Sequence, residues 1–123
     1  MYPERMRKNL EIMGYAVNRF MENLLLIRGG THPKEIRKEF AKVQDILRDV
    51  YEAILNEKPY PGLEQIHLKV VEASRLYLEG VEEFMRFYDD HDDDHFIYAG
   101  LKIDEAGEIF NEVANMFHAA GLL

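Results

Sequence analysis

The sequence predicts an all-α fold, in which a single domain forms an antiparallel, up-down-up-down four-helix bundle. Apolar residues recur at alternating steps of four and three along four segments, which is the spacing of one face of an α-helix. Three short breaks rich in glycine, proline or aspartate separate these segments. No charged residue falls on any of the four apolar stripes. Each helix can therefore turn a continuous apolar face toward the others.

The three breaks set the expected helix bounds. The pair Gly29-Gly30 can end a helix, and Thr31 can cap the next one. The second break, at residues 56–62, contains two prolines and a glycine, and the third, at residues 89–94, is rich in aspartate. Each segment is about 25 residues long, or roughly 37–40 Å as a helix. We expect helices over residues 4–28, 32–56, 62–89 and 93–120 of a domain that covers residues 1–123.

Each segment carries its own apolar stripe. The stripe of residues 4–28 consists of Met6, Leu10, Met13, Val17, Phe20, Leu24 and Ile27. The stripe of residues 32–56 consists of Ile36, Phe40, Val43, Leu47, Val50 and Ile54. The stripe of residues 62–89 consists of Leu63, Ile66, Val70, Ala73, Tyr77, Gly80, Phe84 and Phe87. The stripe of residues 93–120 consists of Phe96, Ala99, Ile103, Ala106, Phe110, Val113, Phe117 and Ala120.

Neighbouring stripes also fit each other in register. Antiparallel closure at the glycine pair sets Phe20 beside Phe40, and closure at residues 89–94 sets Gly80 beside Ile103. In the second hairpin large side chains meet small ones, which allows the layers to interdigitate at native density. Short connections and matched lengths favour packing between helices that follow each other in sequence.

Composition and charge limit the classes of function. The chain has 123 residues, 47% of them hydrophobic, a net charge of −8 and no cysteine. The absence of cysteine excludes disulfides and thiolate metal sites and fits a reducing compartment. The N-terminal residues are charged and periodic, so we expect no secretory signal there, and the longest uncharged apolar run near them is too short to span a membrane. We expect a cytoplasmic protein that binds neither membranes nor nucleic acid, because nucleic-acid binding depends on clustered lysine and arginine.

A di-metal centre inside the bundle is the first chemical possibility. Such a centre needs inward-facing Glu-x-x-His pairs, and the chain has one pair, Glu64 and His67. The inward positions nearby are Leu63 and Ile66, so this pair is expected to point toward solvent. No carboxylate lies on any stripe, and we therefore expect no cofactor in the core.

A second possibility is a divalent metal at one end of the bundle. If residues 91–95 were helical, His91 and His95 would share a face and could bind a metal ion together with Asp94. His32 is expected at the same end of the bundle. The simpler interpretation is that these aspartates cap the last helix and oppose its dipole.

The residues from Arg86 to His91 have an Arg-x4-His spacing. This spacing resembles the motif of the HEPN ribonucleases, which are also small all-α bundles. The resemblance covers six residues and implies an RNA-cleaving site. Phe87, on the apolar stripe, stands where that family usually has a polar residue, and the acidic charge disfavours RNA. We do not assign the chain to that family.

Apolar residues outside the stripes indicate a protein interface. A ridge that runs the length of a helix is better explained by a partner than by chance, and the simplest partner is a second copy related by a twofold axis. The alternative is that neighbouring helices cover the ridge. The residues concerned are Val71, Leu78 and Met85 on one flank of the third helix, and Ile12, Tyr15 and Leu26 on the back of the first.

These features lead to a ranking of functions. We expect a non-enzymatic interaction or adaptor module that forms a homodimer through the flank of the third helix, with an unidentified protein as a further partner. The alternative is a metal-dependent hydrolase or nuclease whose site lies at the end that carries the His/Asp cluster. A third possibility is a carrier for a small apolar ligand between the helices.

Overall fold

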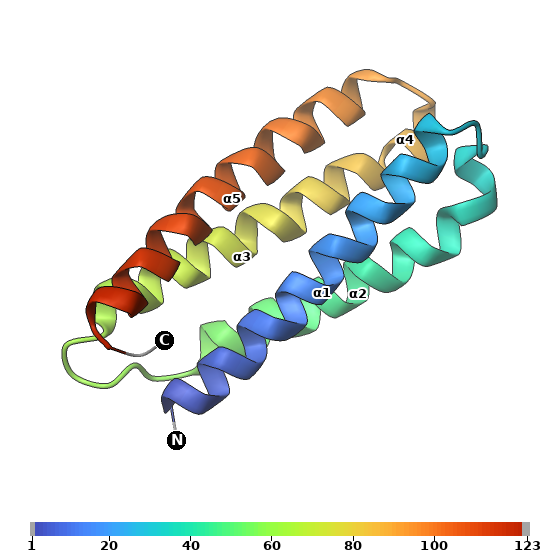
Figure 1. Cartoon of the computed structure of the whole chain (residues 1–123). Coiled ribbons are helices and arrows are strands. Elements are labelled where there is room, and N and C mark those ends of the chain that lie inside the picture. The colour runs from blue at the N-terminus through green and yellow to red at the C-terminus, as the bar shows by residue number, and fades with distance from the viewer. Residues whose placement is uncertain (1, 122–123) are drawn as a thin grey trace.

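The computed structural model describes residues 2–121, so Met1, Leu122 and Leu123 of the predicted domain lie outside the described residues. The four long helices are α1 (Tyr2–Arg28), α2 (Arg37–Asn56), α3 (Glu64–Met85) and α5 (Asp94–Ala119). A 3-10 turn, η1 (Pro33–Ile36), precedes α2, and a short helix, α4 (Phe87–Asp90), follows α3. The chain runs up, down, up and down through the long helices (Figure 1). The predicted all-α four-helix bundle is confirmed.

The structure places an interruption at each of the three predicted breaks. Gly30 and Gly62 adopt φ values of +107° and +92°, and His91 adopts +57° as the left-handed cap that ends α4. Glycine takes such values without strain, whereas a histidine does so only at a tight helix end. The expected cap at Thr31 is wrong, because the Nδ1 of His32 accepts the capping hydrogen bond from the backbone N–H of Lys34 at 3.1 Å.

The core follows the predicted stripes. All six residues of the stripe in residues 32–56 are buried, and so are Met6, Met13 and Phe20 on α1. The predicted contact between Phe20 and Phe40 is confirmed by ring centroids 5.4 Å apart in an edge-on arrangement. Phe84 packs against both rings, with its centroid 4.4 Å from that of Phe40, and Phe96 of α5 lies 4.9 Å from Phe84. All four long helices therefore contribute to one aromatic cluster.

Within residues 2–121, α3 and α5 make the most extensive contact of any two helices. A Cβ atom added to Gly80 would lie 2.7 Å from Cγ1 of Ile103, which confirms the predicted pairing of a small residue with a large one. Ala99 and Ala106 on α5 are fully buried. These small residues allow the two helix backbones to approach closely. In Figure 1, α5 runs alongside α3.

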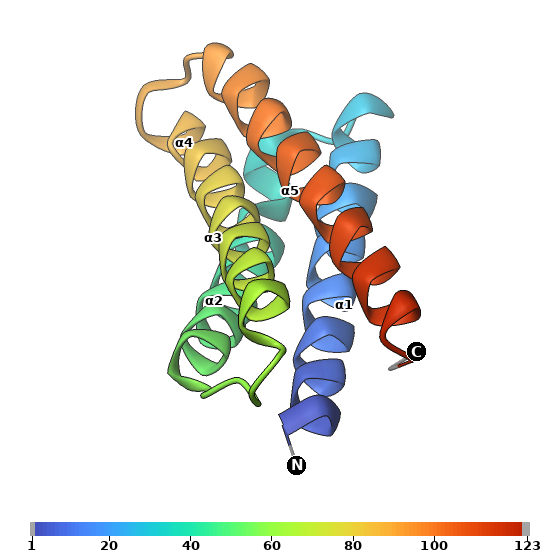
Figure 2. The same cartoon turned by 90° about the vertical axis from the view of Figure 1, so that its left-hand side faces the viewer.

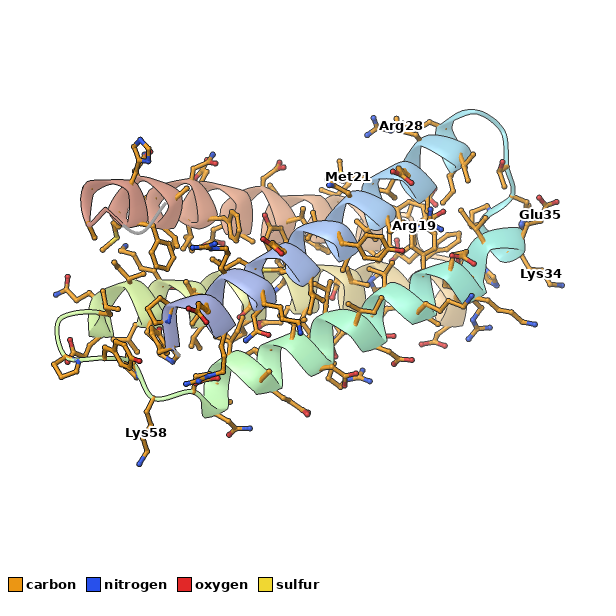
Figure 3. All side chains as sticks on the ribbon, turned by 60° about the horizontal axis from the view of Figure 1, so that its bottom comes forward. Arg19, Met21, Arg28, Lys34, Glu35 and Lys58 are labelled. Carbon is orange, nitrogen blue, oxygen red and sulfur yellow. The ribbon has the colours of Figure 1, made fainter. Side chains whose placement is uncertain are left out.

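The first and last helices are the exception to this regular packing. In an up-down-up-down bundle α1 and α5 should close the ring of four. Within residues 2–121 the two helices hardly approach each other, and α1 is inclined to α5 (Figures 2 and 3). An ion pair joins Arg19 on α1 to Glu39 on α2, and another joins Lys102 on α5 to Glu79 on α3. In the described part of the chain no ion pair joins α1 to α5. The bundle is open along this side.

No helix in residues 2–121 is long and apolar enough to cross a membrane.

Candidate functional site at the α1–α5 seam

The open side of the bundle, which we call the α1–α5 seam, leaves part of the predicted core uncovered. Seven stripe residues along it are only half-buried, although the sequence predicts them to face the core. The corresponding stripe of α2 is fully buried. The seven residues are Leu10, Val17, Leu24 and Ile27 on α1, and Phe96, Ile103 and Phe110 on α5.

Two apolar grooves of about 320 Å³ each lie along the seam. The upper groove, at the Arg28 end, is lined mainly by Phe20, Leu24, Ile27, Phe84, Phe96 and Ile103. The lower groove, at the other end, is lined mainly by Pro3, Leu10, Phe110, Val113 and Phe117. The sequence had suggested that small and large residues fill the space between the helices. That packing is present between α3 and α5 but not between α1 and α5.

The charged residues that line the seam are balanced in sign. Arg28 and Asp104 lie at the upper groove, and Arg7 and Glu11 lie at the lower one. Two arginines and two carboxylates leave the lining neutral, on a chain whose net charge is −8. The seam is therefore apolar and uncharged overall, in contrast to the rest of the surface.

The flank of α3 that the sequence predicted as an interface exposes less apolar surface to solvent than its residue spacing suggested. Leu78 is buried, with 8% of its surface exposed, and Val71 and Met85 are half-buried. α3 lies between α2 and α5, so its neighbours cover a wide arc of it. On the back of α1, Tyr15 and Leu26 are exposed at 58% and 49%, and Ile12 at 37%. A homodimer through the α3 flank stays a prediction that this burial does not favour.

A polar cluster lies at the upper end of the bundle, where His95 stands between two carboxylates. Its Nδ1 lies 2.9 Å from Oε1 of Glu83 on α3, and its Nε2 lies 2.8 Å from Oδ2 of Asp90 on α4. Glu83 also pairs with Arg86. The contacts with Asp90 and Glu83 raise the pKa of His95, and the hydrogen bond from His95 lowers the pKa of Asp90. The cluster fastens the start of α5 to the end of α3.

The structure does not bring the predicted metal ligands together. Residues 91–93 are not helical, so His91 and His95 do not share a helix face, and His91 packs edge-on against Phe87. His32 caps η1, and Asp94 donates its backbone N–H to Asp92. Both ring nitrogens of His95 already contact carboxylates on opposite sides of the ring. Within residues 2–121 no three His, Asp or Glu side chains are placed to hold one metal ion.

The expectation that the Glu64–His67 pair faces solvent is confirmed for Glu64, which is exposed, and is wrong for His67. His67 is buried, and its Nδ1 lies 2.7 Å from the hydroxyl of Tyr2. Burial lowers the pKa of His67 and raises the pKa of Tyr2 to about 12. Glu64 instead accepts a hydrogen bond from the backbone N–H of Gly62. The two side chains of the pair therefore have separate structural roles.

Sequence reasoning singled out Leu101, with Tyr98, as apolar surface on the last helix, and both are exposed, at 63% and 53%. It missed the other exposed apolar residues beside the upper groove. Met21 and Leu25 on α1 are 46% and 62% exposed, and Ile97 on α5 is 60% exposed. Met21 and Leu25, like Ile97 and Leu101, are four residues apart and so lie on one face of their helix. The buried Glu83 was also missed, because nothing in its spacing separates it from a solvated helix face.

The Arg-x4-His segment does not form a joint site either. Arg86 pairs with Glu83, whereas His91 packs on Phe87.

Comparisons of the chain with protein-family models, with curated proteins and with solved structures each gave no match.

Proposed function

We propose that this protein is a non-enzymatic interaction module that associates with a second copy of itself through the α1–α5 seam. The observation that carries the proposal is the incomplete burial of seven apolar residues that lie on the stripes of α1 and α5. Exposed apolar residues are ordinary when scattered, but a continuous line on two facing helices is typical of an interface.

Burial of this surface would favour association. Complete burial of a leucine or phenylalanine side chain contributes about 1.5–3 kcal/mol relative to full exposure. Because the seam residues are only partly buried within one chain, folding of that chain gains only part of this free energy. A helix surface from a second chain could cover the two grooves and bury the rest.

The charge distribution favours a second copy as the occupant. Two chains that each carry a net charge of −8 repel each other over most of their surfaces. The lining of the seam has no net charge, so repulsion is weakest where two seams meet. A surface that carries both arginine and carboxylate can also be complementary to itself across a twofold axis.

The polar side chains at the upper end do not favour an enzyme. Glu83, His95 and Asp90 bind one another, and neither ring nitrogen of His95 is left to act on a substrate. Their contacts account for their positions as a fastening between helices.

The proposal is tested by replacing one exposed leucine beside the upper groove. In sedimentation equilibrium we expect a dimer for the native chain and a monomer for Leu25→Glu, because the new charge would have to be buried at the interface. The matched control is Leu68→Glu, at an equally exposed leucine on α3, 66% exposed, away from the seam. A monomeric native chain, or a Leu25→Glu variant that dimerises as well as the control, would contradict the proposal.

A further inference from the structure

We infer that the twofold axis of the dimer runs along the bundle, in the middle of the α1–α5 seam, so that α1 of each chain lies antiparallel to the partner's α5. In this register Leu25 lies beside the partner's Ile97, and Arg28 lies beside the partner's Asp94. The inference rests on the proposed self-association and adds the direction of its axis, its register and a charged pair.

A twofold axis in the face of the seam can run in two directions. An axis along the helices keeps the height of every residue in the bundle and places α1 of the second copy over α5 of the first. An axis across the helices reverses the height, so that α1 meets the partner's α1 and α5 meets the partner's α5. Facing helices are antiparallel in both arrangements, so the choice depends on which side chains meet.

The exposed apolar residues of the seam all lie near its upper end. Met21 and Leu25 stand in the last turns of α1, and Ile97 and Leu101 in the first turns of α5, each at least 46% exposed. Met21 projects from the edge of α1 that lies away from α2 (Figure 3). At the lower end the exposed side chains beside the seam are polar or charged. They are Arg7, Glu11, Asn111 and Asn115.

This uneven distribution disfavours an axis across the helices. Through the middle of the seam, such an axis would set the apolar upper end of each chain against the polar lower end of the other. At the level of the upper groove, it would leave the lower groove uncovered. With Ile97 beside the partner's Leu101, it would also place Asp94 beside the partner's Asp104, which are like charges in contact. An axis along the helices brings upper end to upper end and covers both grooves.

The two grooves show which parts of α1 and α5 lie at the same height. The upper groove is lined from residues 20–28 of α1 and residues 96–104 of α5. The lower groove is lined from residues 3–11 of α1 and residues 110–117 of α5. Because an axis along the helices keeps these heights, each stretch of α1 meets the partner's α5 at the level of the same groove.

The exposed faces of the two helices match in this register. Both carry their exposed residues at steps of three and four, so that several contacts form together. Two of the contacts are apolar, and in a third an amide can donate a hydrogen bond to a carboxylate. The pairs are Leu25 with the partner's Ile97, Met21 with the partner's Leu101, and Asn18 with the partner's Asp104.

A pair of opposite charges extends the same register at the upper end. Arg28 follows Leu25 by three positions, and Asp94 precedes Ile97 by three. Both charged residues are exposed, and within residues 2–121 neither takes part in an ion pair. The twofold axis forms the contact between Arg28 and the partner's Asp94 twice in each dimer.

Single cysteines can report which helices meet, because the chain has none of its own. Packed helices lie about 8–10 Å apart, within reach of a short bis-maleimide. We expect a mixture of Leu25→Cys and Ile97→Cys chains to give covalent dimers on denaturing gels. Either variant alone should give almost none, since the axis sets its two cysteines on diagonally opposite helices. The matched control is a mixture of Leu68→Cys and Ile97→Cys, because Leu68 is an equally exposed leucine on α3, away from the seam.

Charge reversal tests the pair at the upper end. We expect Arg28→Glu and Asp94→Lys each to raise the dissociation constant of the homodimer at least about tenfold in low salt, because each places like charges together twice. An equimolar mixture of the two should form heterodimers with nearly native affinity, since both contacts then join opposite charges. Lys8→Glu is the control, because it makes the same charge change nearly opposite Arg28 around α1.

The outcomes separate this inference from the proposed function. Covalent dimers in the Leu25→Cys and Ile97→Cys mixture alone support the axis. Cross-linking of Leu25→Cys with itself, as strong as in the mixture, means that α1 faces the partner's α1 and overturns it. If the native chain is a dimer but the mixture links no better than the control, the self-association stands and the register is wrong. A mixture of folded charge variants that fails to pair overturns the contact between Arg28 and the partner's Asp94. A monomeric native chain overturns both the register and the proposed self-association.

Discussion

His95 is the residue through which three helices are fastened together at the upper end of the bundle. Its ring touches Glu83 on α3 and Asp90 on α4 while its own backbone begins α5. Both partners are acceptors, so the contacts are best satisfied when both ring nitrogens carry a proton. The positive charge of the protonated ring is what the site stabilises.

This arrangement predicts a pH dependence that His95 alone should produce. Because folding raises the pKa of His95 above its usual 6.5, its contribution to stability is complete below pH 6.5 and is lost as pH rises through the raised value. We expect His95→Gln to remove this loss in thermal unfolding measured across that range. His118→Gln, at an exposed histidine in the last turn of α5, is the control. If the stability of the native protein changes with pH above 6.5 in the same way as that of His95→Gln, His95 is not the source of the pH dependence.

His67 should act in the opposite direction. Its pKa is lowered by burial, so its contribution to stability is present above pH 6.5 and is lost as pH falls below it.

Sequence reasoning failed for this residue because it treated each helix as having one narrow buried face. The sequence analysis also began the first helix at residue 4, whereas α1 starts at Tyr2 and brings its hydroxyl to His67. A contact between residues 65 positions apart has no local signature.

Among the helices, α3 is the one that holds the molecule together. It packs against α2 on one side and α5 on the other, and its buried residues occupy most of its circumference. This explains why its apolar arc is wider than one stripe requires. The width reflects coverage by two neighbours, which is the alternative that the sequence had left open.

The close approach of α3 and α5 depends on the absence of a side chain at Gly80. Gly80→Ala places a Cβ atom 2.7 Å from Ile103 Cγ1 and 3.3 Å from the carbonyl oxygen of Ala99. We expect it to lower the free energy of unfolding by about 1–2 kcal/mol, since overpacking outweighs the gain in helix propensity. The measurement is denaturant unfolding.

Gly14→Ala provides the matched control for that experiment. A Cβ atom at Gly14 meets nothing within 4 Å, and the residue lies in the middle of α1. The same substitution should raise the free energy of unfolding there by about 0.5–1 kcal/mol. Equal effects at Gly80 and Gly14 would show that close packing is not what requires glycine at Gly80.

The helix bounds were predictable where a backbone signal was strong. The glycines near residues 30 and 62 coincide with real ends, because their positive φ values are accessible mainly to glycine. The break in the third helix at Arg86 was not predicted. No proline or glycine marks it, and the apolar stripe continues through it to Phe87.

At the scale of the whole molecule, the sequence predicted the bundle and its order but not the open seam. The heptad spacing of Leu10, Val17 and Leu24 predicts that one face of the helix is apolar. It does not predict how closely another helix covers that face. Coverage depends on how α1 inclines to α5. The candidate site therefore came from the structure, although its seven half-buried stripe residues had been recognised as apolar.

The unequal coverage of the helices should also be visible in the exchange of backbone amide hydrogens with solvent. Amides near the middle of α3 are flanked by helices on both sides and should open only with the whole protein. Those of α1, whose contact with α2 is far more extensive than its contact with α3, should exchange sooner in dilute solution. Their protection should increase with protein concentration as copies associate. Protection of α1 equal to that of α3 at every concentration would show that the first helix is already held on both sides.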